Sequence, residues 1–247
     1  MYFQSIGSTN DVALKLAATG EGDGAVVIAD SQTSGRGRRG RVWFSPPGSG
    51  LYVSIVLAPA RAAVSPDRAT MLLTLAAGVA LQEGIEAATG LRASVKWPND
   101  VYVGRRKLAG ILAEAVAAAE QSAAARGGFV VLGYGINVAA AAYPPDLADR
   151  ATSLETELGR PVDRAALCAE TLAAIARRYA DLLEGRFDAI LDAWRAKAPG
   201  SRGARVEWSS AGGTRTGVTA GIDDGGALLV QVGDGIERIV GGEVIWR

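Results

Sequence analysis

The stretch from Val95 to Ala115, VKWPNDVYVGRRKLAGILAEA, decides the fold of this 247-residue chain. Its apolar runs predict three successive strands, at 95–97, 101–103 and 108–115. Pro98-Asn99 and Gly104-Arg105 are residue pairs typical of tight turns. The stretch therefore predicts neighbouring strands of one sheet, joined by short turns.

The same stretch carries charged residues that point to chemistry. Lys107 follows Asp100 by seven residues across a turn, so both side chains can face one cleft. A lysine there can stabilise charge on a carboxylate or phosphate during acyl activation. An aspartate can orient or deprotonate an incoming amine. The alternative is a surface ion pair without function, which is the usual meaning of an arbitrary Lys–Asp pair.

Periodicity outside this stretch predicts an α+β fold, a mixed β-sheet flanked by helices. A capped helix should begin at Ser8-Thr9, and a longer one at Pro66-Asp67. After Pro199-Gly200, short alternating strands separated by Asp- and Gly-rich turns predict a small β-barrel. The expected domains are residues 1–200 and 201–247. The remaining predicted elements are strands at 25–29, 51–57 and 129–134, a loop at 139–150, and helices after Asp163 and around 187–194.

Composition excludes several classes of protein. Lys plus Arg and Asp plus Glu both number 26, which argues against a polyanionic partner. The chain has no histidine and one cysteine, Cys168, so we expect no metal-binding residues, no disulfide framework and a reducing compartment. No apolar run suggests a membrane span, and residues 1–5 do not resemble a signal peptide, so a cytoplasmic protein is expected. Residues 1–5 are either native or a tag remnant.

An arginine-rich loop is the strongest single motif. Gly35-Arg36-Gly37-Arg38-Arg39-Gly40-Arg41 alternates glycines with four arginines, and no acidic residue occurs between Asp30 and Asp67. Glycines let backbone N–H groups turn toward an anion, and guanidinium groups clamp phosphates. The loop lies between two predicted strands, which favours a small-anion site. A solvated basic loop or a nucleic-acid-binding arm remains the alternative.

A glycine motif follows the strand at 129–134. Gly133-Tyr134-Gly135-Ile136-Asn137 would let a ligand approach the backbone closely. Alone the motif is weak, because Gly-x-Gly is common in turns.

Taken in order, these motifs resemble the catalytic domain of biotin–protein ligases, the biotin–acetyl-CoA-carboxylase ligase family. The matching segments are Ser8-Thr9-Asn10, Gln32 with the arginine loop and Trp43, KWPND at 96–100, KLAGIL at 107–112, and Gly133 to Asn137. The likeness covers residues 5–138 well, 139–200 loosely, and again the end at Gly241-Gly242-Glu243. It implies a class II synthetase-like fold with a small SH3-like barrel. Because the first motif begins at residue 8, an N-terminal DNA-binding domain, which some members carry, is not expected.

The resemblance also implies roles for individual residues. Lys107, Arg38 and Asp100 are the candidate catalytic residues, with Asp100 handling the acceptor amine. The candidate biotin-binding residues are Ser8, Thr9, Asn10 and Gln32 around the ureido ring, and Arg36, Gly37, Arg38, Lys107, Gly110, Leu112, Gly133 and Gly135 along the rest of the ligand. The candidate nucleotide-binding residues are Arg36, Arg38, Arg41, Trp43, Lys107 and Asn137. Trp43 is either an apolar wall or core, and Tyr143, in a loop expected to cover the adenylate, is a candidate for packing on adenine.

The implied reaction uses biotin, ATP and Mg²⁺, and the implied partner is the biotin carboxyl carrier domain of a carboxylase. A lipoate or octanoate ligase or transferase of the same fold is the competing enzymatic interpretation. A nucleic-acid-binding module and a non-catalytic biotin binder are two non-enzymatic interpretations. Specific DNA and a membrane are not expected as partners. A homodimer is compatible with the sequence, which determines neither the oligomeric state nor the identity of the carrier.

Overall fold

The main sheet of the computed structural model is mixed, as the sequence predicts. The structure describes residues 1–19, 22–116, 128–141, 143–210 and 213–247. Seven strands lie in the order β1-β2-β3-β7-β6-β5-β4. Only the pairing of β1 with β2 is parallel, and the other pairings are antiparallel. The bounds are β1 Tyr2–Phe3, β2 Val26–Ala29, β3 Gly50–Leu57, β4 Ser94–Lys96, β5 Asp100–Val103, β6 Arg106–Ala115 and β7 Val130–Asn137.

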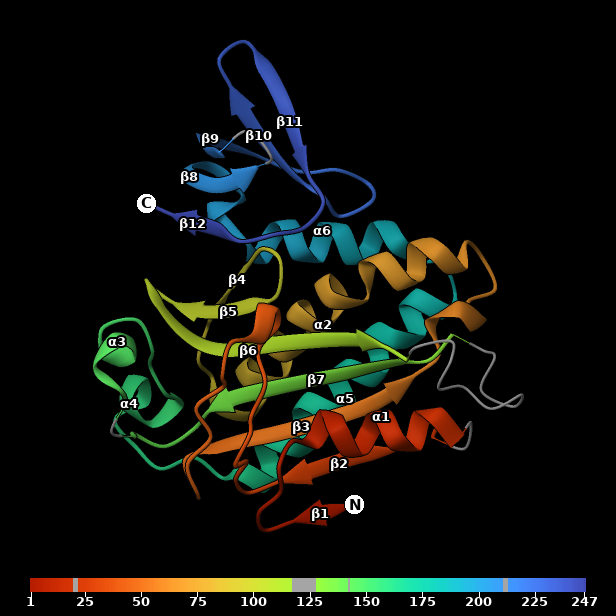
Figure 1. The fold of residues 1–247 in the computed structure, drawn as a ribbon, viewed down its shortest axis with the longest axis vertical. Coiled ribbons are helices and arrows are strands. Elements are labelled where there is room, and N and C mark those ends of the chain that lie inside the picture. The colour runs from red at the N-terminus through yellow and green to blue at the C-terminus, as the bar shows by residue number, and fades with distance from the viewer. Residues whose placement is uncertain (20–21, 117–127, 142, 211–212) are drawn as a thin grey trace.

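Helices cover both faces of this sheet (Figure 1). Alternate residues of β3 contribute to the two layers of helices, because successive side chains of a strand point to opposite faces. Val53 and Ile55 join the core beneath helices α2 and α5, whereas Val56 packs with Ala13 and Ala17 of helix α1. The longer helices are α1 Thr9–Thr19, α2 Pro66–Thr89, α5 Arg164–Leu183 and α6 Phe187–Lys197. Two short helices, α3 Pro145–Ala148 and α4 Leu154–Leu158, follow β7, so part of the region predicted as a loop is helical.

Helix α2 is long and apolar enough, by length and composition, to cross a membrane. The sequence expectation concerned continuous apolar runs, and polar residues such as Thr74 and Gln82 interrupt this helix. Two thirds of its most apolar window, 67%, is buried inside the protein. Residues such as Leu72, Leu81 and Ile85 are fully buried in the core cluster that the sheet and α5 share. The helix is apolar because neighbours surround it on several sides.

The C-terminal segment forms a five-stranded antiparallel sheet, and the predicted barrel is wrong. The strand order is β11-β10-β9-β8-β12, and among the described residues the edge strands β11 and β12 do not pair. Alternating residues and tight turns predict antiparallel hairpins, but closure depends on strand stagger, which they do not encode. The bounds are β8 Arg202–Ser210, β9 Gly213–Ile222, β10 Leu228–Val232, β11 Gly235–Ile239 and β12 Val244–Trp246.

The two sheets share contacts. Val206 and Trp208 of β8 belong to the same buried cluster as the residues under α2. The buried Trp97 also donates its indole N–H to the carbonyl oxygen of Gly226 at 3.0 Å. The tryptophan of the KWPND motif thus ties the turn after β4 to the C-terminal segment.

Two glycines of α2 offer a matched test of this packing. A Cβ on Gly84 would lie 2.6 Å from the backbone Cα of Thr171 in α5, whereas a Cβ on Gly78 would meet nothing closer than Val95 at 3.7 Å. Alanine favours a helix by about 1 kcal/mol over glycine at either position. We expect Gly78→Ala to raise the free energy of unfolding by about 0.5–1 kcal/mol. We expect Gly84→Ala to lower it by about 1–3 kcal/mol, because overpacking outweighs propensity. Urea unfolding of both variants measures the difference, and equal shifts would contradict the close approach of α2 and α5.

Candidate active site

A large cavity is lined by all of the predicted site residues. It lies over the face of the sheet that carries α1 and extends to the C-terminal segment. Its volume is about 1150 Å³, more than a pocket for one drug-sized ligand needs, so two substrates can fit together. Its lining includes these residues from the sequence prediction: Ser8, Thr9, Asn10, Gln32, Arg36, Gly37, Arg38, Arg41, Trp43, Asp100, Lys107, Gly110, Leu112, Gly133, Gly135, Asn137 and Tyr143.

An irregular pairing of β5 with β6 places Lys107 in this cavity. The register runs from Val101 opposite Ala109 to Tyr102 opposite Lys107, so β6 has one extra residue there. In a regular strand, residues three apart would face opposite sides. The bulge instead lets Lys107 share a face with Gly110, where a Cβ would lie 3.1 Å from the lysine Cε. The extra residue, Leu108, is buried in the core.

Lys107 and Asp100 form a close ion pair. Nζ of Lys107 lies 2.6 Å from Oδ1 of Asp100, and the two side chains are only 30% and 19% exposed. The pair is therefore not the solvated surface contact of the alternative interpretation. Its angles fall outside hydrogen-bond geometry, so Oδ1 is buried without a hydrogen-bond partner among the described residues. Lys107 also lies over the ring of Trp43, with 5.3 Å from Nζ to the ring centroid.

The arginine loop is held by partners outside itself. Arg36 contacts Asp11 at 2.9 Å and Glu114 at 2.7 Å. Arg38 donates to Oδ1 of Asn99 at 3.0 Å, and Arg41 pairs with Glu243 of the C-terminal segment. Inside the loop, the N–H of Gly37 donates to the carbonyl of Arg41 at 2.7 Å. Arg36 and Arg41 therefore anchor the two ends of the loop, and Arg38 reaches the middle of the cavity.

Burial, the largest cause, lowers the pKa of Arg38 below its ordinary value, and the nearby charge of Arg39 adds to the effect. Asp100 opposes it. The guanidinium remains charged, but it is partly desolvated, and a bound anion would compensate for that lost solvation.

Polar side chains gather at the end of the cavity beside α1. The backbone N–H of Thr9 donates to Oε1 of Gln32 at 2.9 Å, and the hydroxyl of Thr9 lies 3.2 Å from the same oxygen. Asn10 donates to Glu114 at 2.7 Å. The buried hydroxyl of Ser54 contacts Oγ1 of Thr9 at 2.8 Å and Oδ1 of Asn10 at 2.5 Å. One proton cannot serve both acceptors, so this cluster keeps acceptor capacity for a ligand N–H.

Glycines make the floor of the cavity between this polar end and Lys107. A Cβ on Gly133 would lie 2.0 Å from Oδ1 of Asn10, and one on Gly135 would lie 2.5 Å from Nε1 of Trp43. Any larger residue would displace these side chains. The structure thus explains why the motif needs glycine, and it shows Trp43 as the apolar cover of the floor.

Asn137 and Tyr143 lie at the far end of β7. Nδ2 of Asn137 is buried and donates to the carbonyl of Thr152 at 3.0 Å. The rings of Tyr143 and Phe44 pack with centroids 6.2 Å apart. The two aromatic residues form a surface beside Asn137.

Sequence reasoning missed several residues that hold the site together. Asn99 bridges Arg38 and the carbonyl of Ile111, to which its Nδ2 donates at 2.7 Å. It stands in the KWPND motif, so the motif itself was a usable signal. Glu243 stands in the Gly241–Glu243 segment that resembles the family, but no role was assigned to it. Ser54, Glu114 and Glu243 have partners 44 or more residues away in the chain, so their contacts could not be predicted from local sequence. Among the described residues, no cluster of three or more His, Cys, Asp or Glu could hold a metal.

The anchoring of the arginine loop leads to a test. Glu243→Gln removes the charge that holds Arg41, so we expect faster amide hydrogen exchange across residues 36–43. Glu207→Gln is the matched control, because Glu207 pairs with Arg247 in the same C-terminal sheet, at 2.6 Å. Exchange measured by mass spectrometry should rise for the first variant only. An unchanged exchange rate in the loop of the Glu243 variant would show that the ion pair does not restrain it.

Comparison with known proteins agrees with this geometry. The model of the biotin/lipoate A/B protein ligase family matches residues 2–133, and that of the biotin protein ligase C-terminal domain matches residues 203–247. A biotin–[acetyl-CoA-carboxylase] ligase from Paracoccus denitrificans is 34% identical and covers 97% of each chain. The bifunctional ligase/repressor BirA of Bacillus subtilis is 36% identical over 99% of this chain and 73% of its own.

A solved structure agrees with both segments. The biotin protein ligase of Aquifex aeolicus in complex with biotin and ATP superposes with a TM-score of 0.83 and 30% identity, over 100% of this chain and 97% of that one. The match of both family models, together with a near full-length relative, shows that the chain belongs to the biotin/lipoate A/B protein ligase family and carries the biotin protein ligase C-terminal domain.

Proposed function

We propose that the protein is a biotin–[acetyl-CoA-carboxylase] ligase, which activates biotin with ATP and transfers it to a lysine of a carrier domain. One observation carries the proposal. A polar end, a glycine floor and a pair of cations, Lys107 and Arg38, follow one another along a single cavity. That order matches a ligand with a polar ring, an apolar chain and a terminal carboxylate.

The polar end fits the ureido ring of biotin. A ureido group has two N–H donors and one carbonyl acceptor. Ser8, Thr9, Asn10 and Gln32 offer both acceptors and donors, and Ser54 positions two of them. The glycine floor, with Leu112 and the cover of Trp43, takes the thiophane ring and the valeryl chain. The biotin carboxylate then lies at Lys107.

In the first step, the biotin carboxylate attacks the α-phosphorus of ATP. A new oxygen–phosphorus bond forms, the bond to the β-phosphate oxygen breaks, and pyrophosphate leaves. The carboxylate is already a nucleophile, so the protein contributes positioning and stabilisation of negative charge. Lys107 and Arg38 supply positive charge where carboxylate and phosphate meet. Arg36 and Arg41, expected from the sequence to touch the nucleotide, hold the loop that carries Arg38.

The nucleotide lies beyond Lys107. Trp43, Asn137 and the Tyr143–Phe44 pair offer surfaces for adenine and ribose. Magnesium fits as an ion that arrives with the phosphates, since Mg²⁺ keeps several waters and needs only one or two carboxylates. Asp100 and Asp149 are carboxylates of the cavity that could contact it. When bound, it would neutralise phosphate charge.

In the second step, the ε-amine of the carrier lysine attacks the acyl carbon of biotinyl-adenylate. An amide bond forms, the bond from the acyl carbon to the phosphate oxygen breaks, and AMP leaves. The amine must lose a proton, and Asp100, a carboxylate of the cavity in contact with Lys107, is the proposed acceptor.

The competing functions differ in measurable ways. A lipoate or octanoate ligase would use an acyl group without a ureido ring, and the polar end of the cavity would then serve no ligand. A non-catalytic biotin binder would not turn over ATP. A nucleic-acid module would use the arginine loop as a free basic arm, whereas Arg36 and Arg41 of that loop are paired with carboxylates. Reduced Cys168 and the reaction itself fit a cytoplasmic enzyme, and a homodimer stays a prediction.

Exchange of radiolabelled pyrophosphate into ATP tests the proposed activity. We expect exchange that requires biotin, and labelled biotin should enter a carrier domain when ATP is present. Lipoate and octanoate serve as control substrates. Equal stimulation by either of them would overturn the biotin assignment.

The Lys107–Asp100 pair predicts different defects in the two steps. Lys107→Ala should slow adenylate formation about a hundredfold to a thousandfold, since a preorganised charge is worth roughly 3–4 kcal/mol. Asp100→Asn should slow transfer from preformed biotinyl-adenylate more than it slows adenylate formation. Single-turnover kinetics of each step measure both effects. Asp146→Asn, which changes another carboxylate of the cavity, is the control. Equal losses in both steps for Asp100→Asn, with a lower melting temperature, would favour a purely structural role.

Ser54 offers a test of the ureido assignment. Ser54→Ala removes the hydroxyl that positions Thr9 and Asn10, so we expect the Kd for biotin to rise about tenfold, as for one lost hydrogen bond. Ser49→Ala is the control, because Ser49 donates to the carbonyl of Pro46 instead. Titration calorimetry with biotin measures both. An unchanged Kd for the Ser54 variant would place the ureido ring elsewhere.

A further inference from the structure

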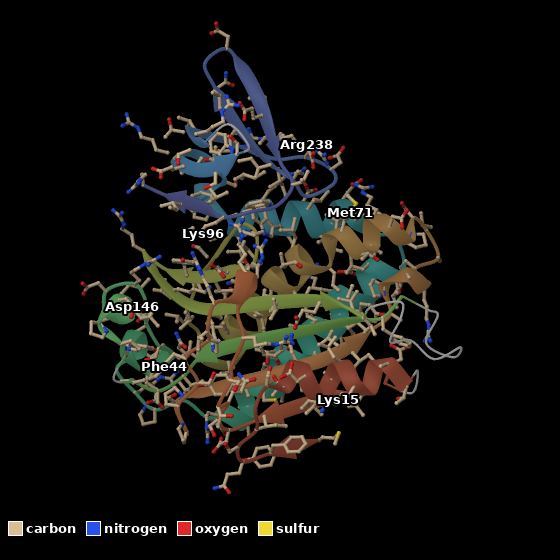
Figure 2. The ribbon with its side chains drawn as sticks, viewed as in Figure 1. Lys15, Phe44, Met71, Lys96, Asp146 and Arg238 are labelled. Atoms are coloured by element: carbon tan, nitrogen blue, oxygen red, sulfur yellow. The ribbon has the colours of Figure 1, made fainter. Side chains whose placement is uncertain are left out.

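Lys96 is a cation of the cavity that the mechanism above does not use. It lies opposite Asp100 in the pairing of β4 with β5, so the two side chains share a face of the sheet. Tyr102 shares this face, and the Lys96 ammonium lies 4.5 Å from the centroid of its ring. Figure 2 shows Lys96 where the main sheet meets the C-terminal sheet, and the same ammonium lies 5.5 Å from the ring of Trp246 in β12.

No carboxylate of the described residues pairs with Lys96. Asp100, the acidic residue nearest along the sheet, is in contact with Lys107 instead. The charges that act on Lys96 are those of Asp100, Lys107, Arg150 and Arg105, so three of the four are positive. Burial lowers the pKa of Lys96 to about 8, and the three cations add to this effect. Keeping the Lys96 ammonium protonated in this environment therefore costs free energy.

Arg105 and Arg150 extend this cluster to the mouth of the cavity. Both line the cavity, both are exposed, and neither makes an ion pair with a described carboxylate. The indole Nε1 of Trp246 is a further buried donor without a partner in the described part of the chain. Like charges that share a partly buried site repel, and unpaired donors cost free energy. An anion with several charges would relieve both costs.

The position of the cluster along the sheet indicates which group of the substrate it would contact. The polar end lies beside β3 and β7, Lys107 is on β6, and Lys96 is on β4 at the edge of the sheet. Two strand spacings, on the order of 10 Å, separate the strands of Lys107 and Lys96. A ligand that places its carboxylate at Lys107 and continues in the same direction reaches Lys96 with the groups that follow the α-phosphate.

We propose that Lys96, with Arg105 and Arg150, binds the diphosphate group of the nucleotide substrate and holds it as it leaves as pyrophosphate. This inference rests on the proposed function. It also implies that Trp246 of the C-terminal segment forms one wall of the subsite. The rings of Tyr102 and Trp246 lie beside the Lys96 ammonium. They help to position it without neutralising its charge, so it can still bind phosphate oxygens. The rival explanation is that Lys96 only braces the two sheets.

The reverse reaction isolates this subsite, because it uses pyrophosphate itself. Biotinyl-adenylate and inorganic pyrophosphate give biotin and ATP, and the pyrophosphate concentration can be varied alone. We expect Lys96→Gln to raise the KM for pyrophosphate about tenfold or more, the usual effect of losing a charged hydrogen bond. Transfer of biotin from preformed biotinyl-adenylate to the carrier should stay within about twofold of the original rate, since no diphosphate is present.

Two further variants control the experiment. Lys15→Gln makes the same chemical change on the exposed side of α1, far from Lys96 in Figure 2, and should leave the KM for pyrophosphate unchanged. Lys96→Arg keeps the charge and should restore most of the affinity. Arg105→Gln, an exposed position, should raise the same KM severalfold without lowering the melting temperature.

The outcomes separate the two proposals. A wild-type protein that makes no ATP from biotinyl-adenylate and pyrophosphate would overturn the proposed function. An active wild type whose KM for pyrophosphate is unchanged by Lys96→Gln would overturn the diphosphate subsite alone. If the Lys96→Gln variant has a lower melting temperature and loses both half-reactions, the Arg105→Gln variant provides the test instead. An unchanged KM for pyrophosphate in the Arg105→Gln variant would favour the bracing role of Lys96.

Discussion

The bulge between β5 and β6 is the constraint on which the cleft depends. Without the extra residue at Leu108, the strand alternation would turn Lys107 toward helix α2 and leave Gly110 alone on the open face. With it, Lys107 contacts Asp100 and lies over the ring of Trp43, from a strand that is paired on both sides. This placement matters here, because the chemistry consists of positioning and charge stabilisation rather than of a protein nucleophile.

Charge distribution explains how a neutral chain can bind two anionic substrates. Its 26 acidic residues balance its 26 basic residues overall, but not within the cavity. Carboxylates hold Arg36 and Arg41 at the ends of the arginine loop, while Arg38 is aimed inward by the neutral Asn99. Arginines with carboxylate partners therefore fix the loop, and cations without them remain for the ligands.

Local sequence predicted much of this structure, because its determinants are local. Turn pairs and apolar runs gave the strands from β4 to β6, the helix at Thr9 and the antiparallel C-terminal hairpins. The β5–β6 register shift, the open edges of the C-terminal sheet, and Ser54 and Glu114 beside Asn10 depend on residues far apart in the chain, which no short pattern encodes. The membrane-like length of α2 went unnoticed because alanines, glycines and a few polar residues interrupt its apolar runs.

The central claim is that one ligand lies along the cavity, from the polar cluster at Thr9 and Asn10 to the cations at Lys107 and Arg38. A crystal structure with bound biotinyl-adenylate tests it most directly. The ureido group should lie within hydrogen-bonding distance of Thr9, Asn10 or Gln32, and the acyl phosphate should contact Lys107 and Arg38. A ureido ring bound away from these side chains, or a phosphate that touches neither cation, would contradict the claim.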